Sequence, residues 1–153
     1  MAALATIGYQ GATPDGFRRA LQEARIELLI DIRAVASSRR PGFSKTKLAA
    51  GVSEVGIEYL HLRALGTPAD GRAAARAGRH AEMRKIFLAH MATPDAEAAL
   101  DDVAQIVGTG RRVCLLCFEA DPAHCHRSIV ASMLAERMPL EITHLTPEAD
   151  PLF

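Results

Sequence analysis

Tryptophan is absent from the 153-residue sequence, which also contains only two tyrosines and five phenylalanines. Because 49% of the residues are nonetheless hydrophobic, the core must be built mainly from aliphatic side chains and alanine. No apolar run approaches the roughly 20 residues that a membrane helix needs. The N-terminal residues also lack the charged and long apolar segments of a signal peptide. We therefore expect a cytoplasmic protein with no membrane partner.

An excess of charge of either sign is also missing, since Lys plus Arg and Asp plus Glu both total 18. This balance argues against a field over the whole protein that attracts nucleic acid or membranes, although a local basic patch remains compatible with it. There are only three cysteines, all between positions 114 and 125. An odd, clustered set is a poor disulfide framework and fits a reducing compartment.

Short apolar segments alternate with helical patterns along the chain, which indicates a mostly parallel sheet. The predicted strands are Leu4–Tyr9, Glu27–Arg33, Ile57–Leu62, Arg112–Phe118 and Leu140–Leu145. Helices are predicted from Pro14, from Ser44 to about Val55, over His80–Met91, over Pro94–Val107 and over Ala123–Met138. Residues 63–79 are rich in Ala, Gly and Arg and predict no clear structure. The length fits one domain, so we expect residues 1–153 to form a single three-layer α/β domain with about five strands.

Polar or reactive side chains follow four of the predicted strands where each one ends. They are Gly8 and Tyr9, then Asp31 and Arg33, then His61, and finally Cys117 and Glu119. In open α/β sheets, ligands bind beyond the carboxyl ends of the strands. We therefore expect a site at this edge of the sheet, although an ion pair between Asp31 and Arg33 would serve structure equally well.

The segment from Cys117 to Arg127 is the densest in reactive groups. If Asp121 caps a helix that begins at Pro122, Cys125 lies in the first turn, where the helix dipole favours a thiolate. Cys125 could then act as a nucleophile with Cys117 as its resolving partner. Glu119 and the imidazoles of His124 and His126 are candidate acids and bases. Helical spacing equally allows Cys125 and His126 to be ordinary core residues.

A metal site in this segment is a weaker hypothesis. Two cysteines and two histidines (Cys117, Cys125, His124 and His126) are acceptable zinc ligands. However, adjacent residues on a helix diverge by about 100°, which argues against Cys125 and His126 sharing one ion. No metal site is predicted, and the cofactor is unknown.

A second candidate feature is the stretch Arg33–Lys47, which carries five basic residues and no acid. The side chains of Arg33, Ser38 and Arg39, together with a helix start at Ser44, could bind a phosphate. An exposed Phe43 could stack on a base, whereas a buried Phe43 would fix the loop. Further basic residues follow at Arg72, Arg76, Arg79, Arg84 and Lys85.

The ordered set of these motifs resembles the family called domain of unknown function 488. The resemblance runs from about Leu4 to Leu145 through Asp31-Ile-Arg33, Ser38-Arg39-Arg40-Pro41-Gly42-Phe43, Cys117-Phe-Glu119 and Cys125-His126-Arg127. It implies an uncharacterised bacterial or archaeal α/β protein, and no reaction. It also implies that functional residues lie among Gly8, Asp31, Arg33, Ser38, Arg39, Phe43, His61, Cys117, Glu119, Cys125, His126 and Arg127.

Three functions remain open at this point. The first is an enzyme, such as a thiol-dependent transferase or hydrolase, that binds an anionic or nucleotide-like molecule through Arg33, Arg39 and Arg127. Its catalytic residues would come from Cys117, Glu119, Cys125, His126 and Asp31. Its substrate contacts would also include Gly8, Tyr9, Ser38, Phe43 and His61.

The second possible function is a nucleic-acid-binding module that uses the basic loop. The third is a metal-binding or redox-sensing protein in which Cys117 and Cys125 pair reversibly. The sequence leaves the oligomeric state open.

Overall fold

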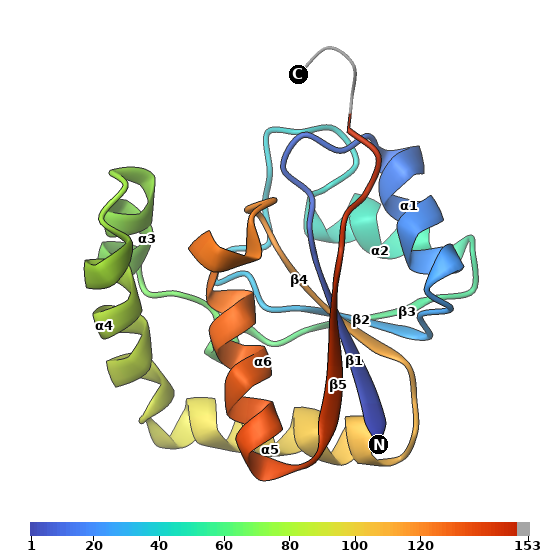
Figure 1. The fold of residues 1–153 in the computed structure, drawn as a ribbon. Helices are drawn as coiled ribbons and strands as arrows, with labels where there is room; N and C mark the ends of the chain where they lie inside the picture. Colours follow the sequence, from blue (N-terminus) through green and yellow to red (C-terminus); the bar gives the residue numbers. More distant parts are fainter. Residues whose placement is uncertain (150–153) are drawn as a thin grey trace.

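In the computed structural model, which describes residues 1–149, five parallel strands form one sheet between two helical layers (Figure 1). The strands are β1 (Ala2–Gly8), β2 (Leu28–Asp31), β3 (Glu58–His61), β4 (Val113–Cys117) and β5 (Leu140–Leu145), in the order β3-β2-β4-β1-β5. Every pairing between these strands is parallel. The predicted three-layer α/β architecture is therefore confirmed, and the sheet is parallel throughout.

Helices α1 (Pro14–Glu23) and α2 (Lys45–Ser53) cover one face of the sheet. Phe17 and Leu21 of α1 and Leu48 and Val52 of α2 pack there against alternate strand residues such as Ile7. Thr13 caps α1, which begins at Pro14 as predicted, and its side chain accepts a hydrogen bond from the Gly16 amide at 2.9 Å.

The other face carries α3 (Ala69–Arg76), α4 (His80–Met91), α5 (Pro94–Gly108) and α6 (His126–Arg137). Short 3-10 turns lie at Arg63–Leu65 and Pro122–His124. Phe87, Leu100 and Val130 are among the residues that fill the core between these helices and the sheet. Helices α3 and α4 stand side by side at the edge of the molecule (Figure 1). No helix in residues 1–149 is long and apolar enough to span a membrane.

The structure corrects the predicted start of the last long helix. Asp121 caps only the turn Pro122–His124, accepting from the Ala123 amide at 2.9 Å. Cys125 then has extended backbone angles (φ −127°, ψ 144°), and α6 begins at His126 instead of Ala123. The Asp-Pro signal for a helix start is real, but it produces one turn that stops before the helix begins.

Candidate functional site

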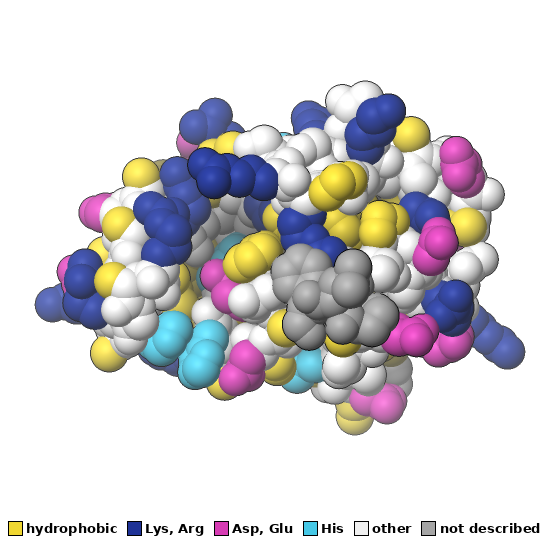
Figure 2. Space-filling model, turned by 90° about the horizontal axis from the view of Figure 1, so that it is seen from above, with side chains coloured by type: hydrophobic (Ala, Val, Ile, Leu, Met, Phe, Trp, Pro, Cys, Tyr) yellow, Lys and Arg dark blue, Asp and Glu magenta, His cyan; other side chains and the backbone are white. Residues whose placement is uncertain are grey.

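A cavity of about 480 Å³ lies at the carboxyl ends of β1, β2 and β4. Its wall includes Tyr9, Arg33, Glu119, His124 and His126, which the sequence analysis had proposed as site residues. Figure 2 looks down on this edge and shows a hollow with Lys and Arg side chains beside it and histidine inside it. The edge of the sheet that was expected to hold a site is therefore hollowed.

The opposite wall comes from α3, within the stretch 63–79 for which the sequence predicted no clear structure, and from the predicted helix α4. It includes Thr67, Arg72, Ala75, Arg76 and Met83. Arg72 and Arg76 lie one helical turn apart on α3, and Nη1 of Arg72 donates to the Thr67 carbonyl at 2.9 Å. The two arginines had been counted as basic residues but not assigned to this pocket. Their spacing of four residues indicates that they share one side of a helix. Only the position of α3 in the fold shows that both arginines line the pocket.

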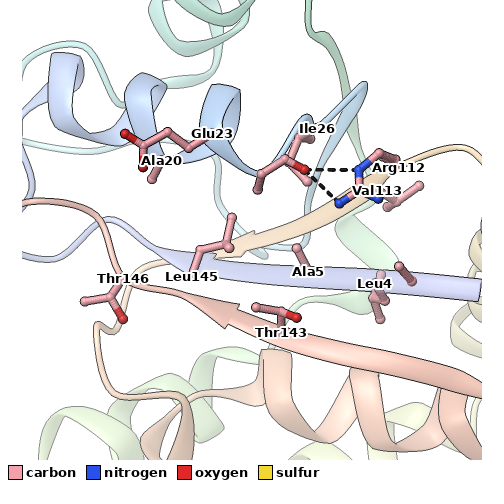
Figure 3. A pocket seen from close by; sticks show the side chains of 12 residues that line it. Leu4, Ala5, Ala20, Glu23, Ile26, Arg112, Val113, Thr143, Leu145 and Thr146 are labelled. Carbon is pink, nitrogen blue, oxygen red and sulfur yellow. Dashed lines mark hydrogen bonds between the residues drawn. The ribbon is translucent and has the colours of Figure 1, made fainter.

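A second cavity, of about 380 Å³, lies between α1 and the strands β1 and β5 (Figure 3). Leu4, Ala5, Ala20 and Leu145 give it a largely apolar lining. Its arginine, Arg112, is already engaged, since Nε and Nη2 donate to the Ala24 carbonyl at 3.1 and 2.9 Å. This cavity holds none of the proposed site residues, so we place the candidate site at the first one.

A buried ion pair supports the floor of the site. Arg33 donates from Nε and Nη2 to the two carboxylate oxygens of Asp31 at 2.9 and 2.7 Å, and both side chains are buried. Burial alone would lower the pKa of Arg33, but hydrogen bonding and attraction to Asp31 outweigh it and raise that pKa. Tyr59 also donates to the Asp31 carboxylate. Asp31 is fully buried and does not line the cavity.

The same arginine fixes the loop that follows β2. Nη1 of Arg33 donates to the Phe43 carbonyl at 2.7 Å, and the Phe43 ring stacks on Tyr9 with centroids 4.6 Å apart. Phe43 is 1% exposed, so it fixes the loop and offers no surface to a ligand. His61 is similarly committed, because its Nε2 lies 2.7 Å from the Arg33 carbonyl.

Ser38 and Arg39 lie outside the cavity wall. The backbone amide of Ser38 donates to the Ser44 hydroxyl at 2.9 Å, and the Ser38 hydroxyl accepts from the Arg40 amide at 3.1 Å. Arg39 is exposed. The Ser44 side chain is therefore hydrogen-bonded within the loop and makes no capping hydrogen bond to α2.

Arg127 is fully buried and holds three segments together. Its Nε donates to the Thr6 hydroxyl at 3.0 Å. Nη1 lies 3.2 Å from the Cys117 sulfur and also donates to the Glu119 carbonyl. Nη2 donates to the Ala120 carbonyl at 3.1 Å. Burial lowers its pKa. A side chain with these partners does not face the cavity as an anion ligand.

Gly8 lies against the same arrangement. A Cβ at this position would lie 1.8 Å from the Glu119 carbonyl oxygen and 2.8 Å from Nη1 of Arg127. Glycine is therefore required here for close approach of β1 to the chain after β4.

Behind the wall, Cys117 and Cys125 are joined by a disulfide, and Cys114 is a free, buried thiol whose pKa is raised by burial. Cys125 Sγ lies 3.8 Å from Nδ1 of the adjacent His126, and the ligand atoms of Cys117, Cys125 and His126 all lie within 4.8 Å of one another. The argument that Cys125 and His126 must diverge was wrong, because Cys125 is extended and precedes the helix. These three side chains could hold a metal ion.

Two groups on the wall have altered acidity. Burial raises the pKa of the Glu119 carboxyl, despite opposing effects from its own backbone amide and Arg127. Burial lowers the pKa of His126 to about 4, so its imidazole is neutral near pH 7. Nε2 of His126 lies 2.8 Å from the Ile32 carbonyl and so carries the proton, which leaves the Nδ1 lone pair free to accept. Perturbed acids and bases in a cavity are typical of functional sites.

A protein-family model described as "Domain of unknown function DUF488" matches residues 13–134. No curated protein matches the chain.

Proposed function

The chain belongs to the DUF488 family, whose description names no reaction, and we propose from the site that it binds an anionic, nucleotide-like small molecule at the carboxyl edge of its sheet. The single observation that carries the proposal is the cavity of about 480 Å³ with Arg72 and Arg76 on one wall. This size lies within the roughly 300–1,000 Å³ of small-molecule sites.

The charge on the wall favours an anion. The neighbouring guanidinium groups of Arg72 and Arg76 offer forked donors of the kind that bind phosphate. Arg76 is exposed, whereas Arg72 is half-buried and oriented by the Thr67 carbonyl. The wall also contains Arg33, which the buried Asp31 largely neutralises. We therefore assign the anion to α3 and give Arg33 the supporting role.

The other part of the wall favours an apolar, flat group. Among the described residues, four large hydrophobic side chains are exposed, and two of them, Val35 (52%) and Phe118 (41%), line this cavity. Phe118 meets the edge of the Tyr9 ring at a centroid distance of 5.3 Å, which holds it in place. An exposed aromatic ring beside paired arginines suits a ligand with both a ring and a phosphate.

Acid–base chemistry is the enzymatic role that these residues support best. Glu119 lines the cavity with a raised pKa, which suits a proton donor, and His126 also lines it with a neutral imidazole. Thiol chemistry by Cys117 or Cys125 would first require reduction of their disulfide. If the protein is a transferase or hydrolase, we propose Glu119 as its general acid.

Nucleic-acid binding by the basic loop receives less support. Arg33 and Phe43 point into the protein, which leaves Arg39, Lys45 and Lys47 as the exposed basic side chains of that stretch. The two lysines lie on α2, on the opposite face of the sheet from α3.

The test is calorimetric titration of the protein with adenosine monophosphate, ribose 5-phosphate and inorganic phosphate. Replacing Arg72 and Arg76 with alanine should weaken binding of adenosine monophosphate by about tenfold or more, equivalent to about 1.4 kcal/mol. The matched control, Lys45→Ala with Lys47→Ala, removes the same charge from α2 and should leave this affinity unchanged. Absence of binding of all three compounds to the wild type would refute the proposal. Oligonucleotide binding that only the α2 variant loses would favour the nucleic-acid function.

A further inference from the structure

We propose that Cys117, Cys125 and His126 form a binding site for a thiophilic divalent cation such as Zn²⁺. The site is open to the cation when the two cysteines are reduced and closed when they form the disulfide. The site shares His126 with the wall of the anion pocket, but it rests on the positions of the ligand atoms and does not require that an anion binds.

The three ligand atoms lie close together, and the two sulfurs, which are bonded to each other in the disulfide, must separate after reduction before both can bind one ion. Sγ of Cys117, Sγ of Cys125 and Nδ1 of His126 all lie within 4.8 Å of one another. On a tetrahedral zinc with ordinary bond lengths, a sulfur and a nitrogen ligand are roughly 3.6 Å apart. Cys125 Sγ and His126 Nδ1 are 3.8 Å apart, so this pair needs little movement.

The histidine is oriented as a ligand. Its Nε2 proton is donated to the Ile32 carbonyl at 2.8 Å, which fixes the ring and directs the free lone pair of Nδ1 toward the sulfurs. Metal-ligating histidines typically donate their second ring nitrogen to a carbonyl or carboxylate in this way. All three side chains are at least nine-tenths buried, at 1%, 2% and 8% exposure.

Charged neighbours complete the site. Nη1 of Arg127 lies 3.2 Å from the Cys117 sulfur, and Oε2 of Glu119 lies 3.8 Å from the same atom. Two thiolates and the Glu119 carboxylate would balance a divalent cation and Arg127. A carboxylate is also an acceptable fourth ligand. Glu119 and His126 line the main cavity and Cys125 lines a separate cavity of about 180 Å³, so the site borders both cavities.

Redox state would control occupancy. A dithiol or phosphine reductant supplies two electrons to the Cys117–Cys125 bond, and the sulfurs take up two protons to become thiols. Binding of the cation then displaces those two protons, and the metal keeps its oxidation state. A disulfide oxidant removes the two electrons again, re-forms the bond and releases the ion. The buried disulfide in the structure corresponds to the closed state.

Cobalt(II) is the probe for the test, because thiolate coordination gives it a near-ultraviolet charge-transfer absorption. Full-length protein reduced with a phosphine and separated from it should bind one Co²⁺ with this absorption, which Zn²⁺ should abolish by displacement. The oxidised protein should bind none. Cys125→Ser and His126→Ala should each lower the affinity at least about tenfold. The matched control, Cys114→Ala, removes the third buried thiol and should retain the signal.

A second measurement needs no variant. In the reduced wild type, saturating Zn²⁺ should slow iodoacetamide alkylation of Cys117 and Cys125, read by peptide mass. Equal alkylation with and without Zn²⁺, no thiolate absorption in the reduced protein, or an unchanged absorption in Cys125→Ser would each overturn the proposal. The anion titrations use other variants, so either proposal can fail alone.

Discussion

Asp31 and Arg33 are two residues apart at the end of β2 and form a bidentate ion pair with almost no exposure to solvent. Such a pair contributes little net stability as a unit, because desolvation offsets the attraction. Its members are nevertheless dependent on each other, since either one alone would be an unpaired buried charge. Sequence reasoning gave this ion pair and a catalytic role equal weight, and the full burial of Asp31 favours the structural role.

Replacing Asp31 with Asn should therefore destabilise the protein by about 3–5 kcal/mol, because Arg33 is left buried without its counter-charge. Urea unfolding followed by circular dichroism measures this loss. The control is Glu148→Gln, which breaks the exposed pair with Arg19 and should cost less than about 1 kcal/mol. Similar losses in the two variants would contradict the assignment of Asp31 to a buried pair.

Tyr59 gives the same cluster a dependence on alkaline pH. Burial, followed by the hydrogen bond and charge of Asp31, raises the pKa of the Tyr59 phenol above its ordinary value of 10.0. The folded state therefore retains this proton where the unfolded state loses it, so the stability that Tyr59 contributes is full below pH 10 and declines as pH rises further.

Tyr59→Phe should accordingly show a shallower loss of unfolding free energy above pH 10 than the wild type. Since the chain has only two tyrosines, ultraviolet titration of phenolate formation in the Tyr9→Phe background reports Tyr59 alone. Titration at the ordinary pKa in that background would contradict the burial of the phenol against Asp31.

At the scale of elements, the close approach of β1 to the chain after β4 depends on Gly8. Gly8→Ala should cost about 1–3 kcal/mol or more, because the new methyl group meets the Glu119 carbonyl, which is held by Arg127. The matched control is Gly108→Ala at the end of α5, where the nearest atom is 3.9 Å from the added Cβ. That change should be neutral or stabilising by up to about 1 kcal/mol. Thermal unfolding of both variants checks the contrast, and equal effects would show that Gly8 has room.

Elements with local signals were predicted well from sequence. The predicted starts of α1 at Pro14 and α5 at Pro94 and the predicted bounds of α4 and β5 agree with the structure. The stretch 63–79 was not assigned, and it contains both a 3-10 turn and α3. Its helix is only eight residues long, and its buried residues, Gly71 and Ala74, are too small to give a clear apolar pattern in the sequence. Packing against α4 supplies what that pattern lacks.

The composition of the site could be predicted only in part for a related reason. Strand ends are local features, so the positions of Tyr9, Arg33 and Glu119 at one edge followed from the parallel topology. Orientation is not local. The orientation of Arg127, which donates to Thr6, and of Phe43, which stacks on Tyr9, depends on contacts between segments far apart in sequence. The opposite wall could not be predicted from the sequence, because α3 belongs to a connection that is remote in sequence from the motif residues and reaches the pocket only in the folded structure.

For the whole molecule, this arrangement makes α3 the element that a ligand should stabilise most. Helices α3 and α4 stand side by side at the edge of the molecule, and an anion held by Arg72 and Arg76 would tie α3 to the wall formed by the residues that follow β1 and β4. At a ligand concentration of 100 times Kd, binding can contribute up to about 2.7 kcal/mol, which limits the slowing of amide exchange in α3 to about 100-fold.

Hydrogen exchange with and without saturating adenosine monophosphate measures this effect, and peptides from α3 should show slower exchange. Helix α1 provides the internal control, because it packs on the opposite face and contributes no residue to the pocket. Arg72→Ala with Arg76→Ala should abolish the change in α3 at the same ligand concentration. Saturation without slower exchange in α3, or equal slowing in α1 and α3, would show that the ligand binds elsewhere, since only an occupant of this pocket joins α3 to the strand ends.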